Sequence, residues 1–328
     1  EPVAESVPSD DEFRFHRRYT DGQLYAPVTG YFSYVFGRGG LENSQNRVLS
    51  GSDNRLFVNR VVDLLSNKQP KGGSVETTLD PLAQKVAASG LESLGKNTKG
   101  AVVALDPSTG AILAMVTQPS YNPNVLASHD FSEVDDDWQR LTRDEDQPML
   151  NRGTQQILPP GSTFKLVTAA AALENLDISP GDDVKAGRTL SFPGIDYKLV
   201  NSDNSTCGGS KITFEQALNV SCNVSFGWLA GKIGQDDLAA QARKFGFGTD
   251  TLAGLASNPT RFRSEGTDLE APQLAQSGIG QFEVAATPLQ MAMVAGGIGN
   301  GGELMRPDIV KAVRGPDPRV LHESEPER

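Results

Sequence analysis

The fold of this chain is organised around residues 151–165, which read Asn-Arg-Gly-Thr-Gln-Gln-Ile-Leu-Pro-Pro-Gly-Ser-Thr-Phe-Lys. The Pro-Pro-Gly cluster at 159–161 interrupts the incoming segment, and the run 166–173 is apolar and rich in alanine, as in a buried helix. We therefore expect Ser162 at a helix start. Lys165, three residues later, would lie on the same face and reach back over the Ser162 hydroxyl at the positive end of the helix dipole. This geometry predicts an activated serine.

A simpler interpretation is that Ser162 only caps the helix, because serine is among the best N-cap residues. The spacing Ser-x-x-Lys is also weak evidence by itself. A second copy runs from Ser93 to Lys96, at the end of another predicted helix. The nucleophile hypothesis therefore depends on what surrounds Ser162.

Length and charge narrow the possible classes of protein. The chain has 328 residues, a length that suggests two domains. Its net charge is -11, with one small basic cluster at 14–18, so we expect no nucleic-acid partner. No apolar run approaches the roughly 18 residues of a membrane helix, and no signal-peptide pattern opens the chain. The sequence begins on Glu1 instead of Met, so we expect an upstream segment that would hold any membrane anchor.

Residues 1–74 are predicted to form a separate, smaller β-rich module. The runs 24–28 and 31–36 are rich in residues that favour strands, 55–65 suits a short helix, and 67–73 has the Lys, Pro and Gly content of a linker. This module carries no recognisable chemistry. We expect it to position the rest of the chain or to bind a partner.

Residues 75–328 are predicted to form a second domain with an α+β fold. A strand is expected at 75–79, and two apolar runs at 101–105 and 111–116 flank a Pro/Gly turn, as in an antiparallel hairpin. The near-continuous hydrophobicity of these runs indicates that both faces are covered. We therefore expect an antiparallel sheet sandwiched by helices.

The helix that follows the first of these strands has clear start signals. Asp80 is a good N-cap residue and Pro81 suits the first helical position. An apolar stripe is expected to face the core, formed by Leu82, Val86, Leu91 and Leu94.

A second polar pair, Ser221 and Asn223, lies between predicted helices at 212–218 and 224–233. Ser-x-Asn occurs five times in the chain, but only this copy is flanked by two apolar helices, where polar side chains would be wasted unless they face a site. The alternative is that Ser221 caps the following helix.

The two cysteines, Cys207 and Cys222, are either buried thiols or a bridge. Cys207 lies in a loop rich in Gly and Ser and is expected to be exposed, so we favour a disulfide and an oxidising compartment. The acidic run 133–137 is interpreted as a solvated loop, and no metal or cofactor is expected.

Considered together, three segments resemble the transpeptidase domain of class B penicillin-binding proteins: 151–165, 212–218 and 221–223. The resemblance runs from about residue 75 to the end. It is supported by further runs at 106–116, 118–124, 280–281 and 286–292. The module before it, with the run 21–28, is similar to the penicillin-binding protein A type of actinobacteria.

The resemblance implies a role for each site residue. Ser162 would be the acylated nucleophile, Lys165 its base, Ser221 a proton relay to the leaving amine, and Asn223 the amide that holds the substrate's peptide group. A free lysine has a pKa of about 10.4, so Lys165 needs burial, a nearby cation or the helix dipole to act as a base.

The implied function is a peptidoglycan D,D-transpeptidase that cross-links stem peptides ending in D-Ala-D-Ala and is acylated by β-lactams. Cell-wall synthesis membrane proteins are implied as partners, on the extracytoplasmic face of the plasma membrane, with a single N-terminal anchor. Two alternatives are a non-catalytic β-lactam-binding scaffold or sensor, and a D-Ala-D-Ala carboxypeptidase.

One element of the family pattern is missing from the sequence. A Lys-Thr-Gly or Lys-Ser-Gly motif is expected several dozen residues after 300–302, and the chain ends at Arg328 without it. We therefore expect that the C-terminal part of the transpeptidase domain, including most of its sheet strands, lies outside this sequence.

Overall fold

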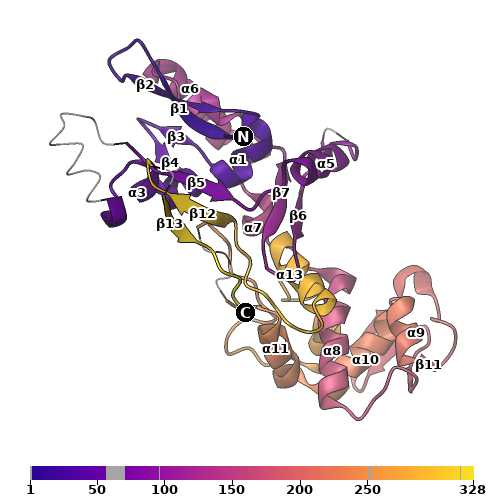
Figure 1. Cartoon of the computed structure of the whole chain (residues 1–328). Helices are drawn as coiled ribbons and strands as arrows, with labels where there is room; N and C mark the ends of the chain where they lie inside the picture. The colour runs from indigo at the N-terminus through magenta and orange to yellow at the C-terminus, as the bar shows by residue number, and fades with distance from the viewer. Residues whose placement is uncertain (1, 57–70, 96, 250–251, 253, 318) are drawn as a thin grey trace. The chain divides into compact units, whose positions relative to one another are not determined.

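The computed structural model describes residues 2–56, 71–95, 97–249, 252, 254–317 and 319–328 (Figure 1). Most of the predicted helix at 55–65 and of the linker at 67–73 lies outside these residues. Two compact units are present and are described separately. The first comprises 1–156, 251–257 and 305–328, and the second comprises 157–250 and 258–304.

The first unit opens with an antiparallel pair, β1 (Ala4–Pro8) and β2 (Phe15–Tyr19). The elements that follow it are α1 (Gly22–Thr29), β3 (Phe32–Ser33), β4 (Gly37–Arg38), α2 (Gly40–Ser44), α3 (Asn46–Leu49) and η1 (Asn54–Leu56).

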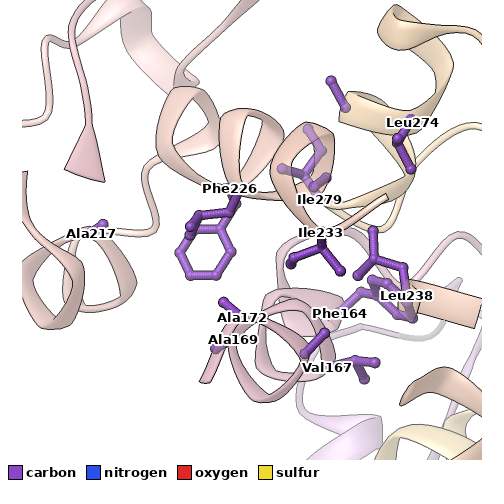
Figure 2. Close-up of a cluster of buried hydrophobic side chains, with 14 of the residues drawn as sticks. Phe164, Val167, Ala169, Ala172, Ala217, Phe226, Ile233, Leu238, Leu274 and Ile279 are labelled. Carbon is purple, nitrogen blue, oxygen red and sulfur yellow. The ribbon is translucent and has the colours of Figure 1, made fainter. Parts of the chain in front are cut away.

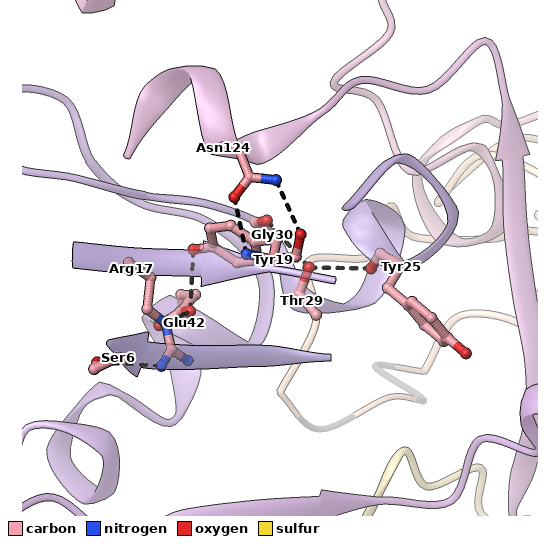
Figure 3. Close-up of polar contacts among 8 residues, drawn as sticks. All are labelled: Ser6, Arg17, Tyr19, Tyr25, Thr29, Gly30, Glu42 and Asn124. Atoms are coloured by element: carbon pink, nitrogen blue, oxygen red, sulfur yellow. Dashed lines mark hydrogen bonds and ion pairs between the residues drawn. The ribbon is translucent and has the colours of Figure 1, made fainter. Parts of the chain in front are cut away.

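The predicted strand at 24–28 is wrong, because these residues belong to the helix α1. Tyr25 and Val28 are almost fully buried, and the Thr29 hydroxyl donates to the Tyr25 carbonyl oxygen at 3.1 Å (Figure 3). Burial of this face outweighs the strand preference of the individual residues. Only Phe32 and Ser33 of the run 31–36 form a strand.

A buried carboxylate ties β2 to α2. Glu42 is 6% exposed, and its Oε1 accepts from Arg17 Nε at 2.6 Å and from the Tyr19 hydroxyl at 3.0 Å (Figure 3). Burial, and then the charge of Glu42, raises the pKa of Tyr19, so the phenol remains a donor. The Asn124 side chain, from η2 (Pro123–Leu126), bonds both the N–H and the carbonyl of Tyr19.

The strand, helix and hairpin predicted after residue 74 are confirmed. They are β5 (Ser74–Thr77), α5 (Pro81–Glu92), β6 (Gly100–Leu105) and β7 (Ile112–Gln118). The Asp80 carboxylate accepts from the N–H groups of Leu82 and Ala83, as expected of an N-cap. Antiparallel pairing joins β6 to β7, and β12 (Val310–Arg314) lies between β5 and β13 (Val320–Glu323).

The predicted apolar stripe of α5 is largely wrong. Leu82, Val86 and Leu94 are 72%, 63% and 71% exposed, and only Leu91 of the four is buried. The helix instead packs on β7 through Gln84, which is fully buried and exchanges two hydrogen bonds with the backbone of Met115, at 2.9 and 2.8 Å. An amide is tolerated there because both of its polar atoms are satisfied.

Two helices complete the described part of this unit: α6 (Phe131–Arg143) and α7 (Arg152–Gln155). The acidic run 133–137 therefore lies on a helix and not in a loop. A Cβ atom on Gly153 would lie 3.1 Å from Val103 and 3.4 Å from Met115, so α7 packs closely on the hairpin.

The second unit is mainly helical. Its elements are η3 (Gly161–Phe164), α8 (Lys165–Asn175), β8 (Asp183–Lys185), β9 (Thr189–Phe192), β10 (Ile195–Val200), η4 (Ser202–Asn204), β11 (Lys211–Thr213), α9 (Phe214–Asn219), α10 (Asn223–Ile233), α11 (Gln235–Lys244), α12 (Ala271–Ser277) and α13 (Pro288–Gly299). Two short antiparallel pairs, β8 with β11 and β9 with β10, lie between the helices in sequence.

The core of this unit forms where α8, α10 and α12 pack together (Figure 2). Phe164, Val167 and Phe226 are all fully buried in it. The predicted helix at 224–233 is confirmed as α10, whereas the one at 212–218 begins only at residue 214. The Thr213 hydroxyl accepts from the Gln216 N–H and so fixes that later start.

Candidate active site

Ser162 lies in the 3₁₀ turn η3, directly before the helix α8. Its side chain is exposed and makes no capping hydrogen bond at either helix start. The hydroxyl of Thr163 instead donates to the Pro160 carbonyl oxygen at 2.7 Å. The N-cap positions are held by Pro160 and Phe164, so Ser162 caps neither helix, and it is exposed.

The ammonium of Lys165 is buried among oxygen atoms. The residue is 1% exposed, and Nζ donates to the Ser221 carbonyl oxygen at 2.7 Å, to Ser221 Oγ at 3.0 Å and to Asn223 Oδ1 at 2.7 Å. The ring of Phe226 lies 5.7 Å from Nζ. The fold thus brings three of the four predicted site residues together from segments more than fifty residues apart. These bonds direct Nζ toward the segment 221–223.

Burial lowers the pKa of Lys165 to about 8. Its three acceptors are neutral oxygen atoms, so no carboxylate among them restores the charged form. With this pKa, about a tenth of the molecules hold a neutral amine at pH 7. A neutral amine is the form that can take a proton from a hydroxyl.

The backbone around Ser221 fixes the geometry of the pair. Ser221 has a φ of 54°, a left-handed conformation that is uncommon for residues other than glycine. The N-cap of α10 is Cys222, so Ser221 does not cap that helix. Asn223 Nδ2 donates to the Val200 carbonyl oxygen at 3.0 Å, which turns Oδ1 toward Lys165.

A disulfide joins Cys207 to Cys222, the residue between Ser221 and Asn223. The expectation that Cys207 is exposed is wrong: it is 9% exposed and Cys222 is fully buried. The bridge removes freedom from the loop that carries both site residues, because it closes a segment 15 residues long.

Asn201 is a supporting residue that the sequence patterns missed. It is 5% exposed, its Oδ1 accepts from the Val224 N–H at 3.0 Å, and its Nδ2 donates to the carbonyl oxygens of Gly187 and Ser205. These bonds hold the start of α10, next to Asn223. No sequence signal singled it out, because the strand before it, β10, contains Asp196 and Lys198 and is mostly exposed, and nothing in the sequence indicated its distant partners.

The segment 280–286 lies beside the residues that lead to Ser162. The Gly161 N–H donates to the Gly280 carbonyl oxygen at 2.9 Å, and Leu158 and Ala286 exchange two backbone hydrogen bonds of 2.9 Å. Gly280 has a φ of 72°, and a Cβ atom there would lie 2.1 Å from the Gly161 carbonyl oxygen. Only glycine fits at this contact.

Two family models match the chain. The penicillin binding protein transpeptidase domain matches residues 100–328, and the penicillin binding protein A dimerisation domain matches residues 1–75. The chain therefore belongs to the penicillin-binding protein transpeptidase family. The resemblance drawn from 151–165 and 221–223 is confirmed, as are the mixed fold of helices and strands and the similarity to the penicillin-binding protein A type.

Named relatives point to one branch of this family. The chain is 40% identical over 331 residues to the peptidoglycan D,D-transpeptidase PbpA of Mycolicibacterium smegmatis. The aligned region covers 99% of this chain and 66% of that protein. It is 39% identical over 321 residues to PbpA of Mycobacterium tuberculosis, and the aligned region covers 96% of this chain and 64% of that protein. The chain thus spans about two thirds of the length of these relatives.

Solved structures agree with the sequence relatives. Penicillin-binding protein A from M. tuberculosis, as its penicillin G acyl-enzyme complex, matches with a TM-score of 0.94 and 37% identity, covering 99% of this chain and 75% of that one. The imipenem acyl-enzyme complex of that protein matches with a TM-score of 0.93 and 38% identity, covering 99% of this chain and 74% of that one.

Within the described ranges, no three His, Cys, Asp or Glu side chains are grouped as metal ligands would be. None of the helices described here has both the length and the apolar character needed to cross a bilayer.

Proposed function

We propose that this protein is a serine-type D,D-transpeptidase that cross-links peptidoglycan stem peptides through an acyl-enzyme on Ser162 and is acylated by β-lactams. One observation carries the proposal. Lys165 lies one helical turn after the exposed Ser162, is buried with a lowered pKa, and donates hydrogen bonds to the side chains of Ser221 and Asn223. The relatives named as D,D-transpeptidases and the β-lactam acyl-enzymes support it.

In this mechanism the neutral amine of Lys165 accepts the proton of Ser162 Oγ as that oxygen attacks the carbonyl of the D-Ala-D-Ala bond. Ser221 Oγ, which accepts from Lys165 Nζ, passes a proton to the amine of the terminal D-Ala as its C–N bond breaks, and takes a proton from the Lys165 ammonium in its place. The amine of a neighbouring stem then attacks the ester carbonyl, which forms the cross-linking amide, breaks the ester bond and returns a proton from that amine to Ser162 Oγ. Asn223 would hold the substrate's peptide group.

Labelling with a fluorescent penicillin tests the nucleophile. The full-length protein should be labelled, and Ser162→Ala should not be. Ser93→Ala is the matched control, because it removes the serine of the second Ser-x-x-Lys spacing, whose hydroxyl donates to the Gly90 carbonyl oxygen. Equal labelling of wild type and Ser162→Ala would refute the proposal.

Turnover of a lipid-linked peptidoglycan precursor separates the remaining functions. A transpeptidase produces cross-linked dimers of stem peptides. A carboxypeptidase releases D-Ala without dimers, and a scaffold or sensor is labelled by penicillin but turns over no natural substrate. Dimers that depend on Ser162 are the outcome we expect.

We further propose that residues 1–74 form a non-catalytic module and residues 75–328 the transpeptidase domain, which the extents of the two family models support. We also propose that the protein works on the extracytoplasmic face of the plasma membrane, where peptidoglycan is cross-linked, and that it has an N-terminal anchor. Membrane proteins that polymerise glycan strands are the proposed partners, because their product is the substrate of cross-linking.

A further inference from the structure

The segment between Gly280 and Ala286 presents two side chains that the proposed mechanism does not use. Its ends are fixed: Gly280 is bonded to Gly161, and Ala286 to Leu158. Between them Val284 is 1% exposed in the core, and the Glu283 carboxylate accepts from the Ser264 N–H at 2.7 Å. The side chains of Gln281 and Phe282 remain outside these anchors, and both are exposed.

Gln281 lies next to the residue that precedes the proposed nucleophile. A Cβ atom built on Gly161 would be 3.7 Å from Gln281 Nε2. Its backbone is held, since its N–H donates to the Gln276 carbonyl oxygen at 3.0 Å and its own carbonyl oxygen accepts from the Val284 N–H at 3.3 Å. Within the described part of the chain, its carboxamide has no hydrogen-bond partner. It is an available amide on a held backbone, next to the residue that precedes Ser162.

Phe282 occupies a position where a bulky side chain is unfavourable twice over. It follows Gln281 in the turn closed by Val284, with a φ of 62°, where turns of this kind take Gly, Asn or Asp. Its ring is also 42% exposed. The backbone conformation does not favour an aromatic residue there, and the described residues do not bury it, so its ring is available for contact with a bound ligand.

We propose that Gln281 and Phe282 recognise the acyl group that Ser162 takes up: the carboxamide of Gln281 bonds the amide of that group, and the ring of Phe282 packs on its apolar side chain. This assignment rests on the proposed function and adds specificity-determining residues to it. The ligand class is a peptide, or a β-lactam with an acylamino side chain, that carries an amide and an apolar group next to the reacting carbonyl.

Two penicillins that differ only in that region provide the test. Benzylpenicillin carries a phenylacetamido group, and 6-aminopenicillanic acid has a bare amine in its place. The readout is the ratio of their second-order acylation rate constants, measured on the full-length protein. In Phe282→Gly we expect this ratio to fall about tenfold, the scale of one lost apolar contact. In Gln281→Ala it should also fall, because 6-aminopenicillanic acid lacks the amide carbonyl.

Matched variants exclude a structural explanation. Phe282→Gly relieves the left-handed backbone and should keep or raise Tm, Phe282→Ala keeps that backbone, and both should lower the ratio equally. Phe282→Leu should restore much of it. Leu173→Ala removes a side chain that is 50% exposed, eight residues along the helix from Lys165, and should leave the ratio unchanged.

The outcomes distinguish the two proposals. If both compounds acylate the wild type and the ratio in Phe282→Gly stays at the wild-type value, this inference is overturned and the proposed function stands. If neither compound acylates the wild type, the proposed function fails, and this assignment fails with it.

Discussion

Replacing Lys165 by methionine separates the chemical cost of its burial from its role in the reaction. The pKa of Lys165 is about 8 in the fold, against 10.5 for an unperturbed lysine side chain. The native state therefore disfavours the ammonium by about 3 kcal/mol at pH 7, since each tenfold change in proton affinity is worth about 1.4 kcal/mol. Methionine fills a similar volume and carries no charge.

The sign of the pH dependence follows from the lowered pKa. Below pH 8 both the folded and the unfolded wild type hold the proton, so the full penalty is present. As the pH rises from about 8 to about 10.5 the native state loses its proton first, and the penalty disappears. Lys165→Met has no titrating group at this position. As the pH rises, the wild type should therefore gain stability relative to Lys165→Met.

The expected change is about 2 to 3 kcal/mol between pH 7 and pH 10, or roughly 5 to 10 °C in Tm for a unit of this size. Thermal unfolding of both proteins at the two pH values measures it, and all other titrating groups cancel in the difference. Methionine removes the hydrogen bonds of Nζ at both pH values, so this loss lowers Tm at each of them. A difference in Tm that does not change with pH would refute the argument from burial.

Three further predictions concern the same site. Acylation by benzylpenicillin should rise with pH along a curve with an apparent pKa of about 8, measured by stopped-flow labelling; a flat profile would argue against Lys165 as the base. Asn223→Asp places a carboxylate beside the ammonium, so this profile should move to higher pH, and movement to lower pH would contradict the contact. Reduction of the bridge between Cys207 and Cys222 should cost about 3 kcal/mol in urea unfolding, with a double-alanine variant as the control; an unchanged midpoint would show that the bridge does not stabilise the loop.

Local signals predicted those elements whose cause is local. The N-cap Asp80, the hairpin at 101–116 and the apolar helix α10 each carry their own sequence pattern, and each is present in the structure. The serine at a helix start is of the same kind, because a breaker cluster and an alanine-rich run lie directly beside it.

The failures share a different cause, which is burial decided by distant residues. The segment 24–28 favours a strand by composition but forms α1 because its apolar side chains are buried. On α5 the buried position is Gln84, whose partner Met115 lies 31 residues away, while Leu82 and Val86 are exposed. No periodicity can indicate that an amide, and not a leucine, faces the core.

The candidate site depends both on local sequence signals and on contacts between distant residues. The spacing of Ser162 and Lys165 could be read from one turn of helix, whereas the bonds from Lys165 to Ser221 and Asn223 depend on a fold that closes over more than fifty residues. Family resemblance supplied that pairing in advance. The support from Asn201 and the position of Phe282 became visible only in three dimensions.

Mass-spectrometric mapping of the penicillin adduct tests the central claim most directly. After the full-length protein is treated with benzylpenicillin and digested, the account predicts a single acylated residue, Ser162, and an unmodified Ser93. An adduct on any other residue, or the same adduct in Ser162→Ala, would contradict it.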